Sequence, residues 1–373
     1  MDPPLNEEDP FSCFGSDRDD KDEDAEDDET DVPAITASVD LARRLVRETN
    51  ARRHDVTGGA PTHLPLCSLD FEVSEDLPAS PSPSGKAAPS RGKGLRSLKR
   101  YACGEEIVRE AAAMRVPNRQ AASSLKEAEA MHARAVQNSF DSLHPETQRA
   151  VMDLSSCGSF LESDEGVLTP LGVYQTNSFK LGDEAYGGLF LTIARINHSC
   201  RPNSNHIWRP DLQKTVVFAS RDIEIGDEIC TTYGPSECLD TAGRRSFLQE
   251  TFSFDCMCDM CVEGNSKGGD DRMIELNSLQ EDISMLAASN KGEAAIQNID
   301  RCLALMEEQD IGNGVFISPL LHYGYLVSCS GLQDDDLARS YLSRELMVIS
   351  NCEGVGSPKA IKIQRLLTGM SSQ

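Results

Sequence analysis

Three cysteines stand within six residues in the second half of the chain, in a C-x-C-x2-C spacing at Cys256, Cys258 and Cys261. Thiolates this close together are typical of a zinc site, in which tetrahedral Zn²⁺ takes sulfur ligands at about 2.3 Å. The cluster supplies three ligands and no suitable one follows it, so the fold must bring the fourth from elsewhere. The nearest upstream cysteines are Cys200, Cys230 and Cys238. The alternative interpretation is three buried thiols without a metal.

The charge of the chain is strongly negative and unevenly distributed. Its 373 residues include 36 Lys and Arg against 61 Asp and Glu, and the net charge of −25 argues against nucleic-acid binding through the overall surface. The first 31 residues hold 15 acidic and two basic residues. We therefore expect an acidic, mostly disordered region over residues 1–66, either a solubilising tail or an arm that attracts a basic protein.

Membrane and targeting signals are not evident in the sequence. No run of 18 apolar residues is present and the N-terminus is acidic, so we expect neither a transmembrane helix nor a signal peptide. We predict an intracellular protein, in the nucleus or the cytoplasm, that is monomeric and binds neither membranes nor nucleic acid directly. In a reducing compartment its 13 cysteines are expected to be thiols or metal ligands.

The hydrophobic pattern divides the rest of the chain into three segments with different predicted secondary structure. Residues 119–154 are rich in Ala, Glu, Gln and Leu, which indicates helices. Residues 168–233 contain short apolar runs broken by Gly, Pro, Asn and Asp, which predicts short strands joined by turns. Beyond Gly268 the apolar residues return to helical spacing and predict about five helices. The chain is long enough for two domains with tails.

Two further clusters precede the three cysteines. Residues 197–203 read Asn-His-Ser-Cys-Arg-Pro-Asn, and residues 226–229 read Gly-Asp-Glu-Ile before a strand that ends at Tyr233. His198 could be a base and Ser199 or Cys200 a nucleophile, but the sequence supplies neither a hydrolase elbow nor a triad partner. Taken singly, each cluster also fits an ordinary turn or strand.

Taken together, these clusters closely resemble the SET-domain lysine methyltransferases. The resemblance covers roughly residues 68–264 and includes Arg-Gly-Lys-Gly-Leu-Arg at 91–96 and Thr-Asn-Ser-Phe at 176–179. Within that superfamily the sequence is most similar to the SET and MYND domain proteins and their fungal-type relatives. It departs from them in one respect, because residues 109–177 contain a single cysteine, Cys157, where the zinc finger of the MYND module would lie.

The resemblance implies an α+β fold. We expect the SET-domain β-architecture of short twisted sheets over residues 67–264, with a helical insertion at about 118–165 and a post-SET zinc segment at 252–264. An all-α C-terminal domain resembling a helical repeat is expected over residues 269–373.

The resemblance also implies a site and a reaction, the transfer of a methyl group from S-adenosylmethionine to the ε-amine of a protein lysine. Tyr233 would be the catalytic tyrosine, and Phe179 and Phe252 would line the lysine channel. The cofactor would be held by Arg91, Gly92, Lys93, Asn177, Asn197, His198 and Phe254. Cys200 would complete a structural Zn²⁺ site with Cys256, Cys258 and Cys261.

The expected partner is a histone or a non-histone protein whose target lysine lies within a basic segment that suits the acidic surface. The alternative hypothesis is a non-catalytic protein in which the SET domain is a scaffold and the helical domain binds a peptide. Retention of Tyr233, Asn197 and His198 favours the enzyme, because a scaffold does not need them.

Overall fold

The computed structural model describes residues 70–74, 92–119, 124–157, 167–182, 185–234, 240–312 and 314–370. The predicted acidic region over residues 1–66 lies outside these ranges, as do two residues of the sequence analysis, Arg91 and Cys238. The described residues combine short sheets with helices, which confirms the predicted α+β class. None of the described helices is long and apolar enough to cross a membrane.

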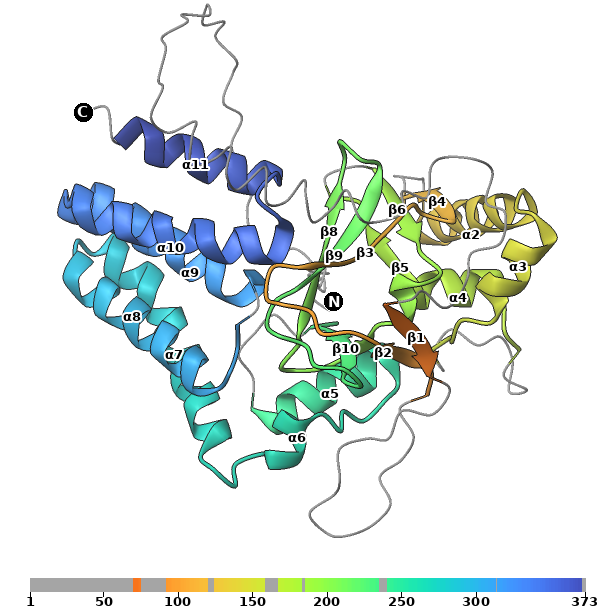
Figure 1. Cartoon of the computed structure of the whole chain (residues 1–373), viewed down its shortest axis with the longest axis horizontal. Helices are drawn as coiled ribbons and strands as arrows, with labels where there is room; N and C mark the ends of the chain where they lie inside the picture. The colour runs from red at the N-terminus through yellow and green to blue at the C-terminus, as the bar shows by residue number, and fades with distance from the viewer. Residues whose placement is uncertain are drawn as a thin grey trace, which may run out of the picture. The chain divides into compact units, whose positions relative to one another are not determined.

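One sheet brings together parts of the chain that are far apart in sequence. Its four strands lie in the order β1 (Phe71–Ser74), β2 (Gly94–Ser97), β10 (Glu228–Thr231) and β7 (Asn197–His198). Strand β10 pairs antiparallel with β2 and parallel with β7, where Thr231 lies opposite His198. The sheet therefore places the Gly-rich segment and the Asn-His pair on either side of the strand that leads to Tyr233. Figure 1 shows β1, β2 and β10 of this sheet.

Two three-stranded antiparallel sheets complete the β structure. One has the order β3 (Glu106–Glu110), β9 (Lys214–Ala219), β8 (Ser204–Arg209), and the other has the order β4 (Met114–Pro117), β6 (Tyr186–Leu189), β5 (Ser178–Lys180). Strand β9 is central, pairing with β3 and β8, and its residues are buried from Thr215 onward, where α10 also packs against it. Its continuous apolar run is what a central strand requires.

Three helices pack beside β4 and β6. They are α2 (Leu125–Asp141), α3 (Pro145–Met152) and α4 (Pro170–Asn177), and α2 contacts both β4 and α4. Ser124 and Thr169 begin α2 and α4 as N-caps, each accepting a hydrogen bond from a backbone N–H of the first turn. The helices predicted within residues 119–154 are thus present, and their apolar faces meet Met114 and Val173 in one core.

The C-terminal part is helical as expected. Its elements are α5 (Thr241–Phe252), α6 (Asp259–Glu263), α7 (Gly269–Ala288), α8 (Gly292–Glu308), α9 (Gly314–Leu326), the π-helical segment η3 (Val327–Leu332), α10 (Asp335–Glu353) and α11 (Pro358–Met370). Helices α7 and α8 pack together, as do α9 and α10 (Figure 1). Helix α10 also lies against β8 and β9, where the Asn205 side chain donates a hydrogen bond to the Cys352 carbonyl at 2.9 Å.

Candidate active site

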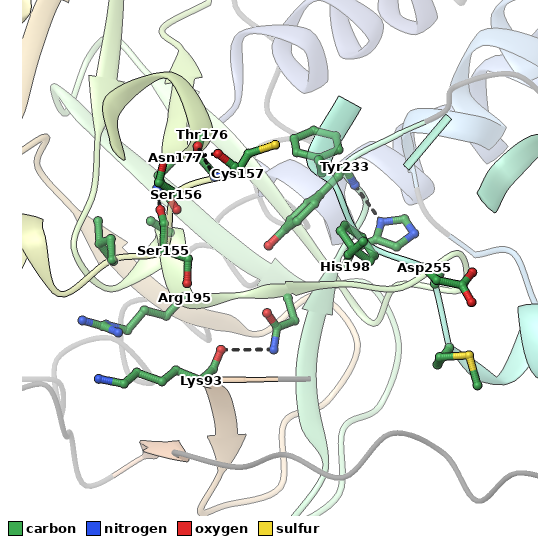
Figure 2. A pocket seen from close by; sticks show the side chains of 17 residues that line it. Lys93, Ser155, Ser156, Cys157, Thr176, Asn177, Arg195, His198, Tyr233 and Asp255 are labelled. Carbon is green, nitrogen blue, oxygen red and sulfur yellow. Dashed lines mark hydrogen bonds between the residues drawn. The ribbon is translucent and has the colours of Figure 1, made fainter. Parts of the chain in front are cut away.

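A cavity of about 290 Å³ lies where the sheet of β2, β7 and β10 meets the segments that follow α3 and α5. Figure 2 shows the side chains that line it. Six parts of the chain that are separated in sequence line it. The lining residues are Lys93, Leu154, Ser155, Ser156, Cys157, Thr176, Asn177, Ala194, Arg195, Asn197, His198, Tyr233, Phe252, Phe254, Asp255, Cys256 and Met257. The cavity therefore exists only in the folded chain.

Tyr233 is held at both ends within this cavity. Its backbone N–H donates a hydrogen bond to Nδ1 of His198 at 3.0 Å, and its hydroxyl donates to the carbonyl oxygen of Ile196 at 2.8 Å. The two rings, Tyr233 and His198, lie 5.5 Å apart between centroids (Figure 2). Because the phenol proton is given to a backbone carbonyl, the phenol oxygen keeps its lone pairs for a second donor.

An aromatic wall faces the tyrosine. The ring centroids of Phe252 and Phe254 lie 5.2 Å and 6.4 Å from that of Tyr233. Helix α5 ends at Phe252, and Ser253 adopts a left-handed conformation with φ of 59°, which turns the chain so that both phenylalanines line the cavity. The arrangement makes this side of the cavity apolar.

Two positively charged side chains, Lys93 and Arg195, also line the cavity. Lys93 Nζ lies 2.9 Å and an Arg195 nitrogen 2.7 Å from the carboxylate of Asp153, at the end of α3. Only 3% of the Arg195 side chain is exposed. Burial opposes ionisation of Asp153, but the hydrogen bonds from Lys93 and Arg195 outweigh it and hold its pKa below the usual range.

Two amide side chains lock neighbouring segments together. The Asn197 amide donates to the Lys93 carbonyl at 3.2 Å, a bond that Figure 2 marks beside Lys93, and to the Glu228 carboxylate at 2.8 Å. The Asn177 amide donates to the carbonyls of Ser155 at 2.7 Å and Val173 at 2.8 Å. Each amide therefore fixes a lining segment and still offers its own oxygen as an acceptor.

The segment 155–157 forms a wall that the sequence analysis did not foresee. The Cys157 N–H donates to Oγ1 of Thr176 at 2.9 Å, and the Cys157 sulfur lies 3.0 Å from Oγ of Ser253. This segment follows α3 and has no periodicity or motif, and Cys157 was a lone cysteine in the sequence. Its contribution to the cavity depends entirely on tertiary contacts.

Two predicted site residues that the structure describes, Phe179 and Gly92, are not among the residues that line the cavity. Phe179 packs instead against Phe190 and His206, with ring centroids 6.0 Å and 4.7 Å away. Gly92 lies next to Lys93 with φ of 73°, a conformation that favours glycine. Arg91 lies outside the described residues. Their roles in the channel and in cofactor binding stay predictions.

Four buried cysteines form the group expected for a metal. The sulfur of Cys200 lies 3.6 Å from that of Cys261 and 4.0 Å from that of Cys256, and with Cys258 all four sulfurs lie within 4.8 Å of one another. Tetrahedral ligation with bonds of about 2.3 Å requires sulfur atoms about 3.8 Å apart. The donor set and its spacing thus fit structural zinc, and Cys230 on β10 is not part of the group.

Two arginines of α5 stabilise this cysteine group. Arg245 donates hydrogen bonds to the carbonyls of Cys256 at 3.1 Å and Cys261 at 3.3 Å. Arg244 is buried beside the cysteine sulfurs. Burial lowers the pKa of its guanidinium, but the negative charge of the nearby Cys261 and Cys200 raises it by more, so the pKa lies above its usual value. A buried guanidinium offsets the negative charge of a four-thiolate set.

A buried carboxylate supports the site from behind. Glu110, at the end of β3, accepts hydrogen bonds from the N–H groups of Leu191, Thr192 and Ile193 at 2.9 to 3.1 Å. These residues lead into the short 3₁₀ helix η2 (Ile193–Arg195), which is followed by Ile196 and β7. Glu110 therefore fixes the turn that carries the hydrogen-bond acceptor of Tyr233. Nothing in the local sequence distinguishes it.

Comparison with known protein families identifies the domain that contains most of this cavity. Residues 92–234 match the model of the SET domain. This segment is a SET domain. Its first and last matched residues lie at the Gly-rich segment before β2 and directly after Tyr233, so the domain contributes most of the lining residues, while the aromatic wall of Phe252 and Phe254 follows it in sequence. The resemblance stated from the sequence is confirmed.

Curated relatives agree with this assignment. The histone-lysine N-methyltransferase set5 of Schizosaccharomyces pombe is 29% identical over 283 residues, which cover 74% of this chain and 81% of that protein. The SET domain-containing protein SmydA-8 of Drosophila melanogaster is 36% identical over 26% of this chain and 22% of its own length. The mouse protein-lysine N-methyltransferase SMYD4 is 28% identical over 31% and 19%. The chain is thus related to fungal SET5 and SMYD-type proteins.

Proposed function

We propose that this protein is an S-adenosylmethionine-dependent protein-lysine N-methyltransferase that acts on lysine in histone or non-histone proteins. The observation that carries the proposal is Tyr233, whose hydroxyl is fixed 2.8 Å from a backbone carbonyl inside the cavity of a SET domain. The relatives named as lysine methyltransferases support the same reaction.

The cofactor has suitable partners along the cavity. When bound, S-adenosylmethionine supplies a methyl group on a positively charged sulfur. Lys93 and Arg195 offer positive charge for its carboxylate, and the oxygens of Asn177 and Asn197 offer acceptors for its ammonium and hydroxyl groups. Phe254 and the backbone beside His198 are suited to its planar base.

The chain's own residues must supply a neutral, aligned amine. A lysine has a pKa of about 10.4 in water, and an ammonium has no lone pair with which to attack. The apolar wall of Phe252 and Phe254 favours the uncharged amine by desolvation. The Tyr233 oxygen can accept a hydrogen bond from that amine and so hold its lone pair toward the methyl group. Alignment is then the main contribution to the rate.

Zinc has a structural role in this proposal. The ligands would be Cys200 from the SET domain and Cys256, Cys258 and Cys261 from the segment after α5. Because Phe252 and Phe254 immediately precede those three cysteines, the metal would hold the aromatic wall over the cavity. This corresponds to the post-SET segment expected from the sequence.

A transfer assay with labelled S-adenosylmethionine tests the proposal. Purified protein is incubated with histones and with a cell lysate, and wild type is compared with Tyr233→Phe. We expect the variant to lose at least about tenfold in rate, the equivalent of about 1.4 kcal/mol of transition-state alignment. Tyr323→Phe is the matched control, because its hydroxyl contacts Ser284 in the helical region. Equal background for wild type and Tyr233→Phe would favour the non-catalytic scaffold.

A further inference from the structure

The imidazole of His198 joins two parts of the molecule that the proposed reaction treats separately. Its Nδ1 lies 3.0 Å from the backbone nitrogen of Tyr233, and its Nε2 lies 3.3 Å from the sulfur of Cys200. The residue is 3% exposed. One rigid ring therefore spans from the tyrosine of the cavity to a cysteine of the metal-binding group.

The hydrogen bonds determine which nitrogen carries the proton. A backbone N–H can only donate, so Nδ1 must accept and cannot be protonated. In the neutral ring the proton is then on Nε2, which points at the Cys200 sulfur. A metal-bound thiolate is a suitable acceptor for this N–H, and such a bond both orients the ligand and reduces the charge on its sulfur.

From this geometry we infer that the His198 side chain is a positioning residue that couples occupancy of the four-cysteine site to the backbone of Tyr233. The inference rests on the proposed function for its consequence in catalysis. It goes beyond the proposed cofactor contacts, because those use the backbone near His198, whereas this role belongs to the ring. Loss of the metal would release Cys200, the ring would lose its contact with the Cys200 sulfur, and the acceptor of the Tyr233 N–H would be held less firmly.

Two substitutions separate the two ends of the ring. In His198→Asn the side-chain oxygen takes the place of Nδ1 and still accepts from Tyr233, but nothing reaches Cys200. In His198→Gln the terminal amide takes the place of Nε2 and still donates to Cys200, but the acceptor for Tyr233 is lost. Both side chains are smaller than or similar in size to histidine and introduce no charge.

The first measurement is the rate at which zinc passes to 4-(2-pyridylazo)resorcinol. We expect about tenfold faster release from His198→Asn, in the range typical for loss of an outer hydrogen bond to a metal ligand, and a rate within about twofold of wild type from His198→Gln. The second is hydrogen–deuterium exchange of the peptide that contains Tyr233. We expect about tenfold faster exchange in His198→Gln and near wild-type exchange in His198→Asn.

The coupling itself is tested by removing zinc with a chelator. Exchange at Tyr233 should rise in wild type and should respond much less in His198→Asn, where the link to Cys200 is already broken. His144→Asn is the matched control, because His144 is an exposed helix N-cap and asparagine is an equally good one. This variant should behave as wild type in both measurements.

Faster zinc release only in His198→Asn, together with faster exchange at Tyr233 only in His198→Gln, supports the inference. Three results overturn it. They are equal effects of the two variants on zinc release, unchanged exchange at Tyr233 in His198→Gln, and uniformly faster exchange that extends through β8 and β9, which would make His198 a general core residue. None of these measurements needs enzyme activity. A wild-type protein without methyl transfer would therefore refute the proposed function, while the zinc and exchange data would still decide the role of the ring.

Discussion

Removing the Glu110 carboxylate should lower the free energy of unfolding more than removing the carboxylate of a surface glutamate. Glu110 is 7% exposed and accepts hydrogen bonds from three consecutive backbone N–H groups, of Leu191, Thr192 and Ile193. Burial raises its pKa, while those three backbone bonds act in the opposite direction. The turn they belong to delivers Ile196, whose carbonyl fixes the Tyr233 hydroxyl. The perturbation therefore reaches the cavity.

The magnitude follows from counting the donors that each variant leaves unpaired. Glu110→Ala strands three buried N–H groups, and at about 1 to 3 kcal/mol for each, reduced by relaxation of the turn, we expect a loss of about 3 to 5 kcal/mol in the free energy of unfolding. Glu110→Gln keeps one acceptor oxygen and turns its amide toward the remaining donor, so the expected loss is about 1 to 3 kcal/mol. A typical domain has a total of about 5 to 15 kcal/mol.

Urea unfolding followed by circular dichroism measures these losses. Glu106→Gln is the matched control on the same strand, because Glu106 pairs with the half-exposed Arg109 across three residues of the strand and such a pair contributes about 1 kcal/mol or less. The reasoning is refuted if Glu110→Ala loses no more than Glu106→Gln, or if Glu110→Gln is the more damaging of the two Glu110 variants.

Three further predictions concern the metal, the pH dependence and the cofactor. Metal analysis should find about one zinc per chain, absent from Cys258→Ser, and a folded wild-type protein without zinc would contradict the metal assignment. Burial lowers the pKa of His206 to about 4, against about 6.5 unfolded. Because the unfolded state takes up this proton more readily, wild type should lose up to about 3 kcal/mol of unfolding free energy as the pH falls from 6.5 toward 4, and none above pH 6.5. The difference in unfolding free energy between wild type and His206→Asn should therefore shrink on acidification, and a constant difference would contradict this. Asn177→Ala should weaken S-adenosylhomocysteine binding about tenfold in calorimetry through loss of the Ser155 anchor, whereas Asn277→Ala, in helix α7, should leave it unchanged.

The metal group shows how far spacing alone can go. The C-x-C-x2-C pattern required a fourth ligand from upstream, and three cysteines remained open at that point. The family resemblance named Cys200, and among the described residues Cys200 does lie with the later cluster whereas Cys230, on β10, does not. A local pattern identifies ligands that are neighbours in sequence, whereas the ligand that closes the site is a property of the fold.

Other parts of the site leave no local trace at all. Glu110 stands in a strand sequence, Glu-Ile-Val-Arg-Glu, whose first glutamate is partly exposed and whose last is buried. What separates the two is a turn more than 80 residues later that presents three N–H groups to one of them. The same holds for Ser155 and Cys157, which line the cavity because α4 and α5 hold them there.

The charge at the cavity differs from the charge of the whole chain. The sequence places six basic residues and no acidic one between Lys86 and Arg100. Two of them are paired in the structure, since Lys99 contacts Glu105 and Arg100 contacts Asp222, away from the cavity. Lys93 instead lines the cavity with Arg195, and the single carboxylate of Asp153 between them leaves this cluster with one net positive charge. A protein with a net charge of −25 thus keeps a cationic end in its cavity, where the carboxylate of the proposed cofactor would bind, while its acidic exterior suits a lysine-bearing substrate.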